Sequence, residues 1–386
     1  MTAAPFDVAV VGGGLAGRAA ALAVAQAGLR TLHLAPAGPP DRRTSALMGP
    51  SVAYLQRLGV VGDPPDFGEP LRQIRIIDAT ERLLRAPETL FDSGDAGLEA
   101  FGWNFANIAL AERFEAAAAT LPNLITRSEA AEAVEITEDG GRLHLTGGEV
   151  VAAPLVVGAD GRNSSVRAAA GIAVREHAFA QAALVCDLEL SRPLLGQSVE
   201  FHYDNGPFTL VPAGERRANL VWIDTRDVLE AARVDAEGLA ATLAARAQHL
   251  FGTVALKSPA FIFPLGTLSV ARAGARGAVL IGEAAHAFPP IGAQGLNLGL
   301  RDVADLSEVL AGLDRGAADW AVTASTAYAQ RRAGDLARTG TIVDTLFRSL
   351  LADMLPAQAL RAGGLWALKL LPPLRRQAFA LGMGAR

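Results

Sequence analysis

The sequence predicts an α/β fold. It consists of a Rossmann-like nucleotide-binding domain, an inserted, mainly antiparallel β-sheet domain, and a helical C-terminal tail. Three observations lead to this prediction. A valine-rich strand at residues 6–11 runs into the turn GGGLAG and an alanine-rich helix. A second strand, turn and helix occupy residues 279–302. Between them, residues 173–264 alternate apolar and polar positions, which favours strands over helices.

Length and composition exclude several classes of protein. The chain of 386 residues can hold two or three domains, and its net charge of -5 gives no electrostatic case for a nucleic-acid partner. No apolar run approaches the roughly 20 residues of a membrane span. The single cysteine, Cys186, excludes an intrachain disulfide and is expected to be a buried, inert thiol. Because no signal peptide is recognisable, we expect a cytoplasmic location.

The first glycine-rich turn has the spacing of a dinucleotide fingerprint. Gly12 makes the tight turn, Gly14 admits a pyrophosphate, and Gly17 lets the helix pack on the strand. The alternative, a purely structural turn, is disfavoured because a strand precedes the motif and a helix follows it. The second strand, residues 30–34, ends at Ala35 where an acidic ribose ligand is usual. Capture of phosphate by the helix N-terminus does not depend on that residue.

The second stretch has the same order of elements. Residues 279–281 form an apolar strand that stops at Gly282, so its tip presents Glu283. Two prolines then extend the chain, and two glycines allow backbone to approach a ligand closely. From Leu296 the pattern is helical, and the N-terminus of that helix can hold an anion.

This second stretch resembles a flavin motif of a known family. The motif reads roughly G-D-A-A-H, then Pro, a Gly-rich turn and Gly-x-Asn at the start of a helix. It belongs to the FAD-dependent aromatic hydroxylases, which are group A flavin monooxygenases of the para-hydroxybenzoate hydroxylase and UbiH/UbiF type. Glu283 replaces the usual Asp. The matching residues are Gly282, Ala284, Ala285, His286, Pro290, Gly292, Gly295 and Asn297.

Three further segments carry the same resemblance. DRRTSAL at residues 41–47 is similar to D-x-R-x-x-A-L, which makes Arg43 either a flavin-nucleotide contact or an ordinary solvated arginine. In FGWNFANIAL, Asn107 is either a flavin contact or a helix N-cap. ADGRNSSVR is similar to D-G-x-x-S-x-x-R. Its Asp160 would accept from a ribose or ribityl hydroxyl, and its Arg167 would pair with a nicotinamide phosphate or brace the turn.

The resemblance therefore implies a set of site residues. Backbone near Pro290 would shape the oxygen-transfer site, and the expected role of His286 is to order its turn rather than to transfer protons. The histidines show no metal-ligand spacing, so no metal is expected. The cofactor-binding set comprises Gly12, Gly14, Gly17, Arg43, Asn107, Asp160, Gly161, Gly282, Glu283, Gly292, Gly295, Leu296 and Asn297.

A para-hydroxybenzoate hydroxylase-like arrangement divides the chain into three parts. The FAD-binding domain is discontinuous and comprises residues 1–72, 100–172 and 268–345. The substrate domain comprises residues 73–99 and 173–267, where Phe208, Pro212 and Trp222 either line a cavity or belong to the core. The tail, residues 346–386, is basic and amphipathic. It is expected to dock at a membrane surface, to contact a partner helix, or to pack as a lid.

The function implied is an FAD-dependent monooxygenase. It would hydroxylate the aromatic ring of a polyprenylated phenol in ubiquinone biosynthesis through a 4a-hydroperoxyflavin, formed from oxygen and flavin reduced by NADPH or NADH. The tail could bring the enzyme to the membrane or to a quinone-synthesis complex. Two alternatives are a soluble aromatic hydroxylase and a non-catalytic, lipid-binding member of a quinone-synthesis assembly. The Trp-x-Trp-x-Ile-Pro signature of flavin halogenases is absent.

Overall fold

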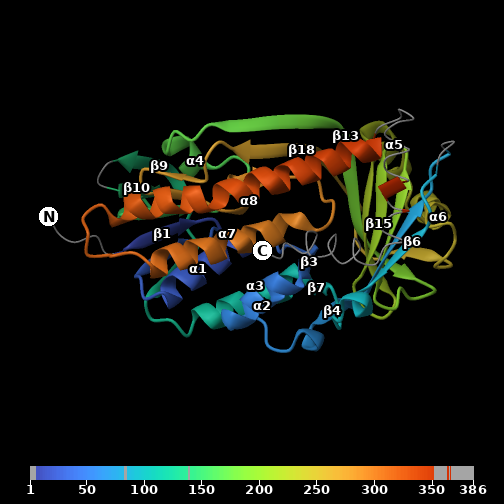
Figure 1. The fold of residues 1–386 in the computed structure, drawn as a ribbon, viewed down its shortest axis with the longest axis horizontal. Helices are drawn as coiled ribbons and strands as arrows, with labels where there is room; N and C mark the ends of the chain where they lie inside the picture. Colours follow the sequence, from blue (N-terminus) through green and yellow to red (C-terminus); the bar gives the residue numbers. More distant parts are fainter. Residues whose placement is uncertain (1–5, 82–84, 138–139, 352–362, 365, 367–386) are drawn as a thin grey trace.

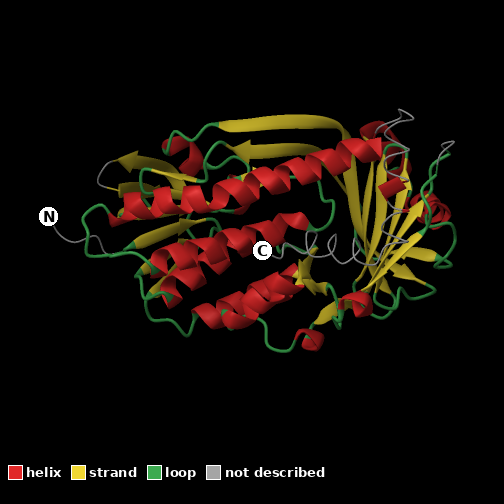
Figure 2. Cartoon of the chain, viewed as in Figure 1, coloured by secondary structure: helices red, strands yellow, loops and turns green. Residues whose placement is uncertain are grey.

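The structure, a computed structural model, describes residues 6–81, 85–137, 140–351, 363–364 and 366. Two large sheets lie at opposite ends of an elongated molecule, and long helices run between them (Figure 1). Colouring by secondary structure makes the division plain, with helices gathered over one end and strands dominating the other (Figure 2).

The first large sheet has six strands. Five of them are parallel, and the short edge strand β19 is antiparallel to its neighbour. The spatial order is β19 (Gly274–Ala275), β20 (Ala278–Leu280), β12 (Leu155–Gly158), β1 (Val8–Val11), β2 (Thr31–Leu34) and β8 (Leu124–Arg127). Strands β1, β12 and β20 are short, buried and apolar, as expected for a parallel sheet covered on both faces, whereas the edge strand β8 is partly exposed and includes Arg127.

Helices cover one face of this sheet, and a three-stranded sheet covers the other. Val8 and Val10 point into a core shared with the helices, whereas Ala9 and Val11 point into a core shared with the small sheet. The helices are α1 (Leu15–Gln26), α2 (Gly49–Arg57), α3 (Asn107–Ala118), α7 (Gln294–Ala311) and α8 (Trp320–Leu351). The opposite face carries β9 (Ala131–Thr137), β10 (Gly140–Leu145), β11 (Val150–Ala153) and helix α4 (Ser165–Ala169).

The second large sheet has nine strands and is mainly antiparallel, with one parallel pair, β14 and β5. Helices α5 (Arg226–Arg233) and α6 (Ala236–Arg246) pack on its outer face around a core that includes Leu229 and Leu243. Eight strands follow the spatial order β21 (His286–Ala287), β18 (Phe261–Val270), β13 (Val174–Leu190), β16 (Arg217–Thr225), β15 (Gly206–Pro212), β14 (Gln197–Tyr203), β5 (Gln73–Asp78) and β6 (Thr89–Asp92). The ninth strand, β17 (Val254–Leu256), pairs with β13.

A small sheet lies between the two large ones. It is formed by β3 (Thr44–Met48), β7 (Gly102–Ala106) and β4 (Gly68–Leu71), and side chains on it contact the nine-stranded sheet. Single 3-10 turns complete the described chain: η1 (Pro64–Asp66), η2 (Ser93–Ala96) and η3 (Gly282–Ala284).

The fold class predicted from the sequence is confirmed, and its elements fall close to the expected residues. The helix predicted from Leu296 begins two residues earlier, at Gln294. The sequence analysis did not predict helices α2 and α5 or strands β8 to β11. The domain boundaries stay a prediction, although β5 and β6 do join β13 to β18 in one sheet.

The tail prediction, residues 346–386, lies largely outside the described residues. Within the part of the chain that the structure describes, none of the helices combines the length and the apolar character needed to cross a bilayer.

Candidate cofactor site

The three glycine-bearing turns lie at one edge of the parallel sheet. Strands β1, β12 and β20 are neighbours and parallel, with Val11 opposite Gly158 and Gly158 opposite Leu280. The chain leaves all three at the same edge because parallel strands place their carboxyl ends together. In open α/β sheets this edge is where ligands bind. The turns that the sequence separates by more than a hundred residues therefore meet.

The first turn is held by close packing of backbone. Gly12 has φ +127°, and a Cβ there would stand 2.1 Å from the carbonyl oxygen of Ala159. A Cβ on Gly17 would stand 2.0 Å from the carbonyl oxygen of Gly12. Only glycine fits either position, so helix α1 and the turn after β12 close directly on the first turn.

Gly14 differs from Gly12 and Gly17 because there is space at its Cβ position. No heavy atom of the described residues lies within 4 Å of the place where its Cβ would stand. It is the N-cap of α1 and has no side-chain cap, so the first amide groups of the helix have no side-chain acceptor. Open space in front of a helix N-terminus is what a pyrophosphate requires.

Two side chains that the sequence analysis did not single out hold the carbonyl groups of this turn. Arg18 donates to the carbonyl of Gly13 at 2.9 Å and pairs with Glu115. His33, at the end of β2, lies 3.1 Å from the carbonyl oxygen of Gly12. Burial, together with the positive charge of Arg18, lowers the pKa of His33 to about 4, so the imidazole is neutral at pH 7.

Asp160 follows β12, and its carboxylate is already engaged by helix α4. It accepts from the hydroxyl and amide groups of Ser165 at 3.0 and 2.7 Å, from Ser164 Oγ at 2.5 Å and from the amide of Val166 at 3.2 Å. Contact of this carboxylate with a flavin hydroxyl stays a prediction. Next to it, Gly161 has φ +79° and open space at its Cβ position.

Arg167 connects the second and third turns. It is buried, and it donates to the carbonyl of Ala284 at 2.9 Å and to that of Arg162 at 2.6 Å. Of the two roles left open for this residue, the bracing role accounts for these contacts. The turns after β12 and β20 are thereby tied to each other.

The third turn, η3, is held by hydrogen bonds to the buried carboxylate of Asp302. Asp302 of α7 accepts from the amide of Gly282 at 2.9 Å and from His286 Nε2 at 2.7 Å. As expected, His286 orders the turn; its exposure is 3%, and it faces Asp302. Glu283 is exposed at the tip, while Gly282 packs against Ala16 of α1. The first and third turns are therefore in contact.

The N-terminus of α7 has an unusual cap. Ala293 adopts φ +53° and ψ +35°, and Gly292 before it has φ +65°. The side chain of Asn297 accepts from the amide of Met48 at 2.9 Å and donates to the carbonyls of Ala46 and Ala293. Asn297 thus fastens the start of α7 to β3 by its side chain.

Gly295 and Leu296 lie in the first turn of α7, and no described heavy atom lies within 4 Å of the Cβ position of Gly295. Pro290 is exposed in the turn that precedes the helix. Space is therefore present where a ring could meet the helix N-terminus.

Arg43 and Asn107 meet through a third residue, Asp41. The Asp41 carboxylate accepts from Arg43 Nε at 2.7 Å and from Asn107 Nδ2 at 2.8 Å. Burial alone would raise the pKa of Asp41, but these hydrogen bonds outweigh it and lower the pKa. The N-cap of α3 is Ala106, so the alternative role of Asn107 as an N-cap is wrong.

The Arg43 segment also faces the third turn. The hydrogen bond to Asp41 raises the pKa of the Arg43 guanidinium, and the negative charge of Glu283 adds to the increase. Arg43 and Glu283, far apart in sequence, are therefore electrostatic neighbours, and with Asp41 they place charges of both signs at this part of the site.

Of the two alternatives for Phe208 and Trp222, cavity lining or core, the structure supports the core. Both are buried in the core beneath α6, and Arg246 lies 4.3 Å from the Trp222 ring centroid. Pro212 is buried too, and its carbonyl accepts from Asn104. Because strand residues alternate faces, the opposite face of these strands, carrying Val221 and Ile223, is the one that approaches Ile291.

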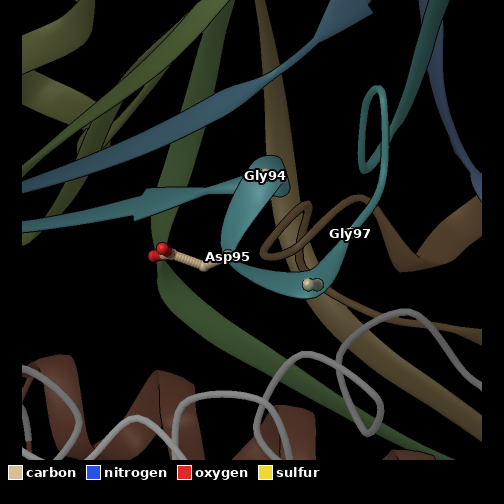
Figure 3. Close-up of a pocket in the computed structure, with 4 residues that line it drawn as sticks. Gly94, Asp95 and Gly97 are labelled. Atoms are coloured by element: carbon tan, nitrogen blue, oxygen red, sulfur yellow. The ribbon is translucent and has the colours of Figure 1, made fainter.

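A hollow of about 580 Å³ lies elsewhere, on η2. Its described lining is Gly94, Asp95, Ala96 and Gly97, and the carboxylate of Asp95 projects away from Gly97 (Figure 3). It includes no residue of the predicted cofactor-binding set, and we assign the cofactor to the edge of the parallel sheet. Among the described residues no cluster of His, Cys, Asp or Glu could hold a metal ion.

Fold and site together define a dinucleotide-binding flavoprotein. The open space beside Gly14 at the N-terminus of α1 can hold the pyrophosphate of FAD. The partial positive charge at the N-terminus of α7 can stabilise negative charge on the flavin ring. Comparison with known proteins gives the family. The model of the FAD binding domain family matches residues 5–337.

The chain belongs to the FAD-dependent hydroxylases of this family. It is 31% identical to ubiquinone hydroxylase UbiL of Rhodospirillum rubrum, over 98% of this chain and 89% of that protein. It is 30% identical to 3-demethoxyubiquinol 3-hydroxylase of Escherichia coli, over the full length of both. Among solved structures, p-nitrophenol 4-monooxygenase PnpA of Pseudomonas putida has the same fold, with a TM-score of 0.78, 19% identity and 98% coverage of both chains.

Proposed function

We propose that this protein is a monooxygenase that hydroxylates the aromatic ring of a polyprenylated phenol in ubiquinone biosynthesis, with FAD, oxygen and NADPH or NADH. The observation that carries the proposal is the convergence of three glycine-bearing turns and the α7 N-terminus on one edge of a parallel sheet. The names of its full-length relatives, both ubiquinone-pathway hydroxylases, support the substrate class.

In this site the flavin supplies the redox and oxygen chemistry when bound. The chain's own residues would hold and orient it: the N-terminus of α1 would receive the pyrophosphate, and Arg43 and Asn107 would contact the flavin nucleotide. The N-terminus of α7 would stabilise negative charge on the ring. Glu283 at the tip of the third turn would accept from a ribityl hydroxyl, in place of the usual aspartate.

The substrate ring would lie between this edge and the inner face of the nine-stranded sheet. The packed cluster of Val221, Ile223 and Ile291 makes this region apolar. Apolar side chains suit a prenylated ring, because burial of hydrocarbon is worth about 25 cal/mol per Å². His286 is engaged with Asp302 and is not expected to act as a base. Hydroxylation of an activated phenol does not require a strong base from a side chain.

The test uses a strain that lacks the gene, with its lipids measured by mass spectrometry. We expect an under-hydroxylated quinone precursor to accumulate and the wild-type gene to remove it. Gly14→Val should fail to complement, because its side chain occupies the pyrophosphate cradle. Gly62→Val should complement as the wild type does, since Gly62 is exposed and has open space at its Cβ position in a loop far from the site.

Three results would count against the proposal. Normal quinone in the deletion strain would reject the pathway. A purified protein that stays colourless with added FAD would favour the non-catalytic, lipid-binding alternative. An FAD-bound enzyme that hydroxylates small phenols while the quinone remains normal would favour the alternative of a soluble aromatic hydroxylase.

The proposal includes membrane contact through the basic tail, which contains no acidic residue between positions 356 and 386. Cationic, amphipathic segments bind anionic lipid surfaces. Deletion of residues 356–386 should reduce co-sedimentation with anionic liposomes. Equal sedimentation of the truncated and full-length proteins would remove this part of the proposal.

A further inference from the structure

Helix α8 connects the two ends of the molecule. It runs from the edge of the parallel sheet to the nine-stranded sheet, where it reaches β15 (Figure 1). At the parallel sheet, Ser325 accepts from the amide of Gly277, and Tyr328 donates to the carbonyl of Leu280 at 2.9 Å. Leu280 is the last residue of β20, so α8 contacts the strand from which the third turn departs.

A second contact reaches the turn itself. Arg332 Nε donates to Asp302 Oδ1 at 2.7 Å. The other oxygen of the same carboxylate holds the Gly282 amide and His286. A single residue, Asp302, therefore connects Arg332 to the backbone of η3. This turn includes Glu283, which would contact the flavin.

A third contact reaches the N-terminus of α7. Arg332 Nη1 donates to Asp335 at 2.7 Å and to Asp305 at 2.8 Å. Asp335 in turn pairs with Arg301 at 3.2 Å, and Arg301 lies 3.5 Å from the side chain of Gln294, the first residue of α7. The same helix thus holds both parts of the second flavin-binding stretch.

These contacts are buried and permanently charged at their centre. Arg332 and Tyr328 have no solvent exposure, and Asp302 has none either. Burial alone would lower the pKa of Arg332, but the negative charge of Asp302 and the hydrogen bond to Asp335 raise it. A buried charge that moves away from its partners loses its ion pairs, which is costly. The network therefore fixes α7 and the third turn relative to α8.

We propose that α8 positions the flavin-binding stretch, with Arg332 and Tyr328 as its positioning residues. Arg332 acts through Asp302 on the amide of Gly282, and Tyr328 acts through the carbonyl of Leu280. Neither side chain touches the flavin or the substrate. The inference rests on FAD binding at this edge of the sheet and does not depend on which phenol is hydroxylated.

The test substitutes lysine for each of two adjacent arginines of α8. Arg332→Lys keeps the buried positive charge but loses the planar guanidinium, whose nitrogens donate to Asp302, Asp305 and Asp335. Arg331→Lys is the matched control. It is the same change in the same helix, and within the described chain Arg331 pairs with Asp305 and Glu308 at the more exposed side of the network.

The readouts are the dissociation constant of FAD from the apoprotein, the visible circular dichroism of the bound flavin and its midpoint potential. None of them needs a substrate. We expect Arg332→Lys to weaken FAD binding at least fivefold and to change the dichroism and the potential. In steady-state assays with NAD(P)H, kcat should fall while KM for NAD(P)H stays within twofold. Arg331→Lys should match the wild type within twofold in every readout.

The proposal is overturned if a folded Arg332→Lys protein has the flavin spectrum, potential and affinity of the wild type, or if Arg331→Lys changes them equally. Should Arg332→Lys fail to fold, Tyr328→Phe decides. It removes a single hydrogen bond without changing the shape of the helix, and it should shift the flavin dichroism and weaken FAD binding at least twofold. A Tyr328→Phe protein identical to the wild type in these readouts would overturn the proposal.

Discussion

The two ends of the flavin site are built by different physical means. The turn after β1 is shaped by backbone contacts that only glycine permits, at Gly12 and Gly17. The turn after β20 is shaped by a buried carboxylate, Asp302, which belongs to a helix that begins twelve residues after Gly282. The first turn is therefore specified by residues within it, and the second by residues from α7 and α8.

This difference predicts how each turn should fail. A turn defined by steric exclusion should tolerate no Cβ but should be insensitive to distant charge changes. A turn held by buried ions should depend on the completeness of an ion network, because removing one partner leaves another charge buried without compensation. Substitutions in the two turns therefore test whether steric exclusion holds the first and buried ions hold the second.

The largest effect is expected at Asp302. Asp302→Asn removes the negative charge that faces Arg332 and His286, and it should lower the free energy of unfolding by about 3–5 kcal/mol, measured by urea denaturation. Glu308→Gln is the control. Its side chain is 62% exposed, so a loss of no more than about 0.5 kcal/mol is expected. A cost below about 1 kcal/mol for Asp302→Asn would show that the ion network does not hold the second turn.

The next effect is expected at Gly12. Gly12→Ala places a Cβ 2.1 Å from the carbonyl of Ala159 at a backbone φ of +127°, and we expect a loss of about 3 kcal/mol in the free energy of unfolding. Gly62→Ala, at an unstrained and open position, should be nearly neutral. If the two alanine variants unfold at the same urea concentration, steric exclusion does not define the first turn.

The smallest effect concerns pH and the support of the first turn by His33. Its pKa is about 4 in the folded protein and 6.5 when unperturbed, mainly because of burial. The unfolded chain therefore binds a proton at higher pH than the folded protein does. This contribution to stability is complete above pH 6.5 and is lost as the pH falls toward 4.

His33→Gln removes this titration. The difference in free energy of unfolding between wild type and His33→Gln should shrink by roughly 2–3 kcal/mol between pH 7 and pH 4, as followed by urea denaturation at each pH. A difference that is constant with pH would mean that the imidazole has the same pKa in the folded and the unfolded protein, and would contradict its burial against the Gly12 carbonyl.

Much of the fold could be predicted because its signals are local. The strand, glycine turn and helix at residues 6–26 follow one another without interruption, and both the alternation in β13 to β16 and the apolar run of β20 are visible in short windows. Helix α5 was missed although its eight residues are strongly amphipathic around the buried Leu229. Strands β9 to β11 alternate, but the sequence analysis made no use of that pattern.

The site was predicted less completely, for a related reason. Arg43 and Asn107 were singled out from motifs, yet the residue that joins them, Asp41, depends on a contact between segments that are far apart in the chain. Contact of Asp160 with the flavin stays a prediction, and the engagement of its carboxylate by α4 was not anticipated. Phe208 and Trp222 were considered for the cavity because aromatic type is visible in sequence, but the face of a strand that meets the core is not.

The sequence by itself determined where backbone approaches backbone most closely, since neither Gly12 nor Gly17 has room for a Cβ. Tertiary structure alone decided which charges meet. Arg332, Asp302 and Gly282 come together only when α7 and α8 pack on the sheet, and the free energy of a buried ion pair depends on distances and solvent exclusion that no local pattern encodes.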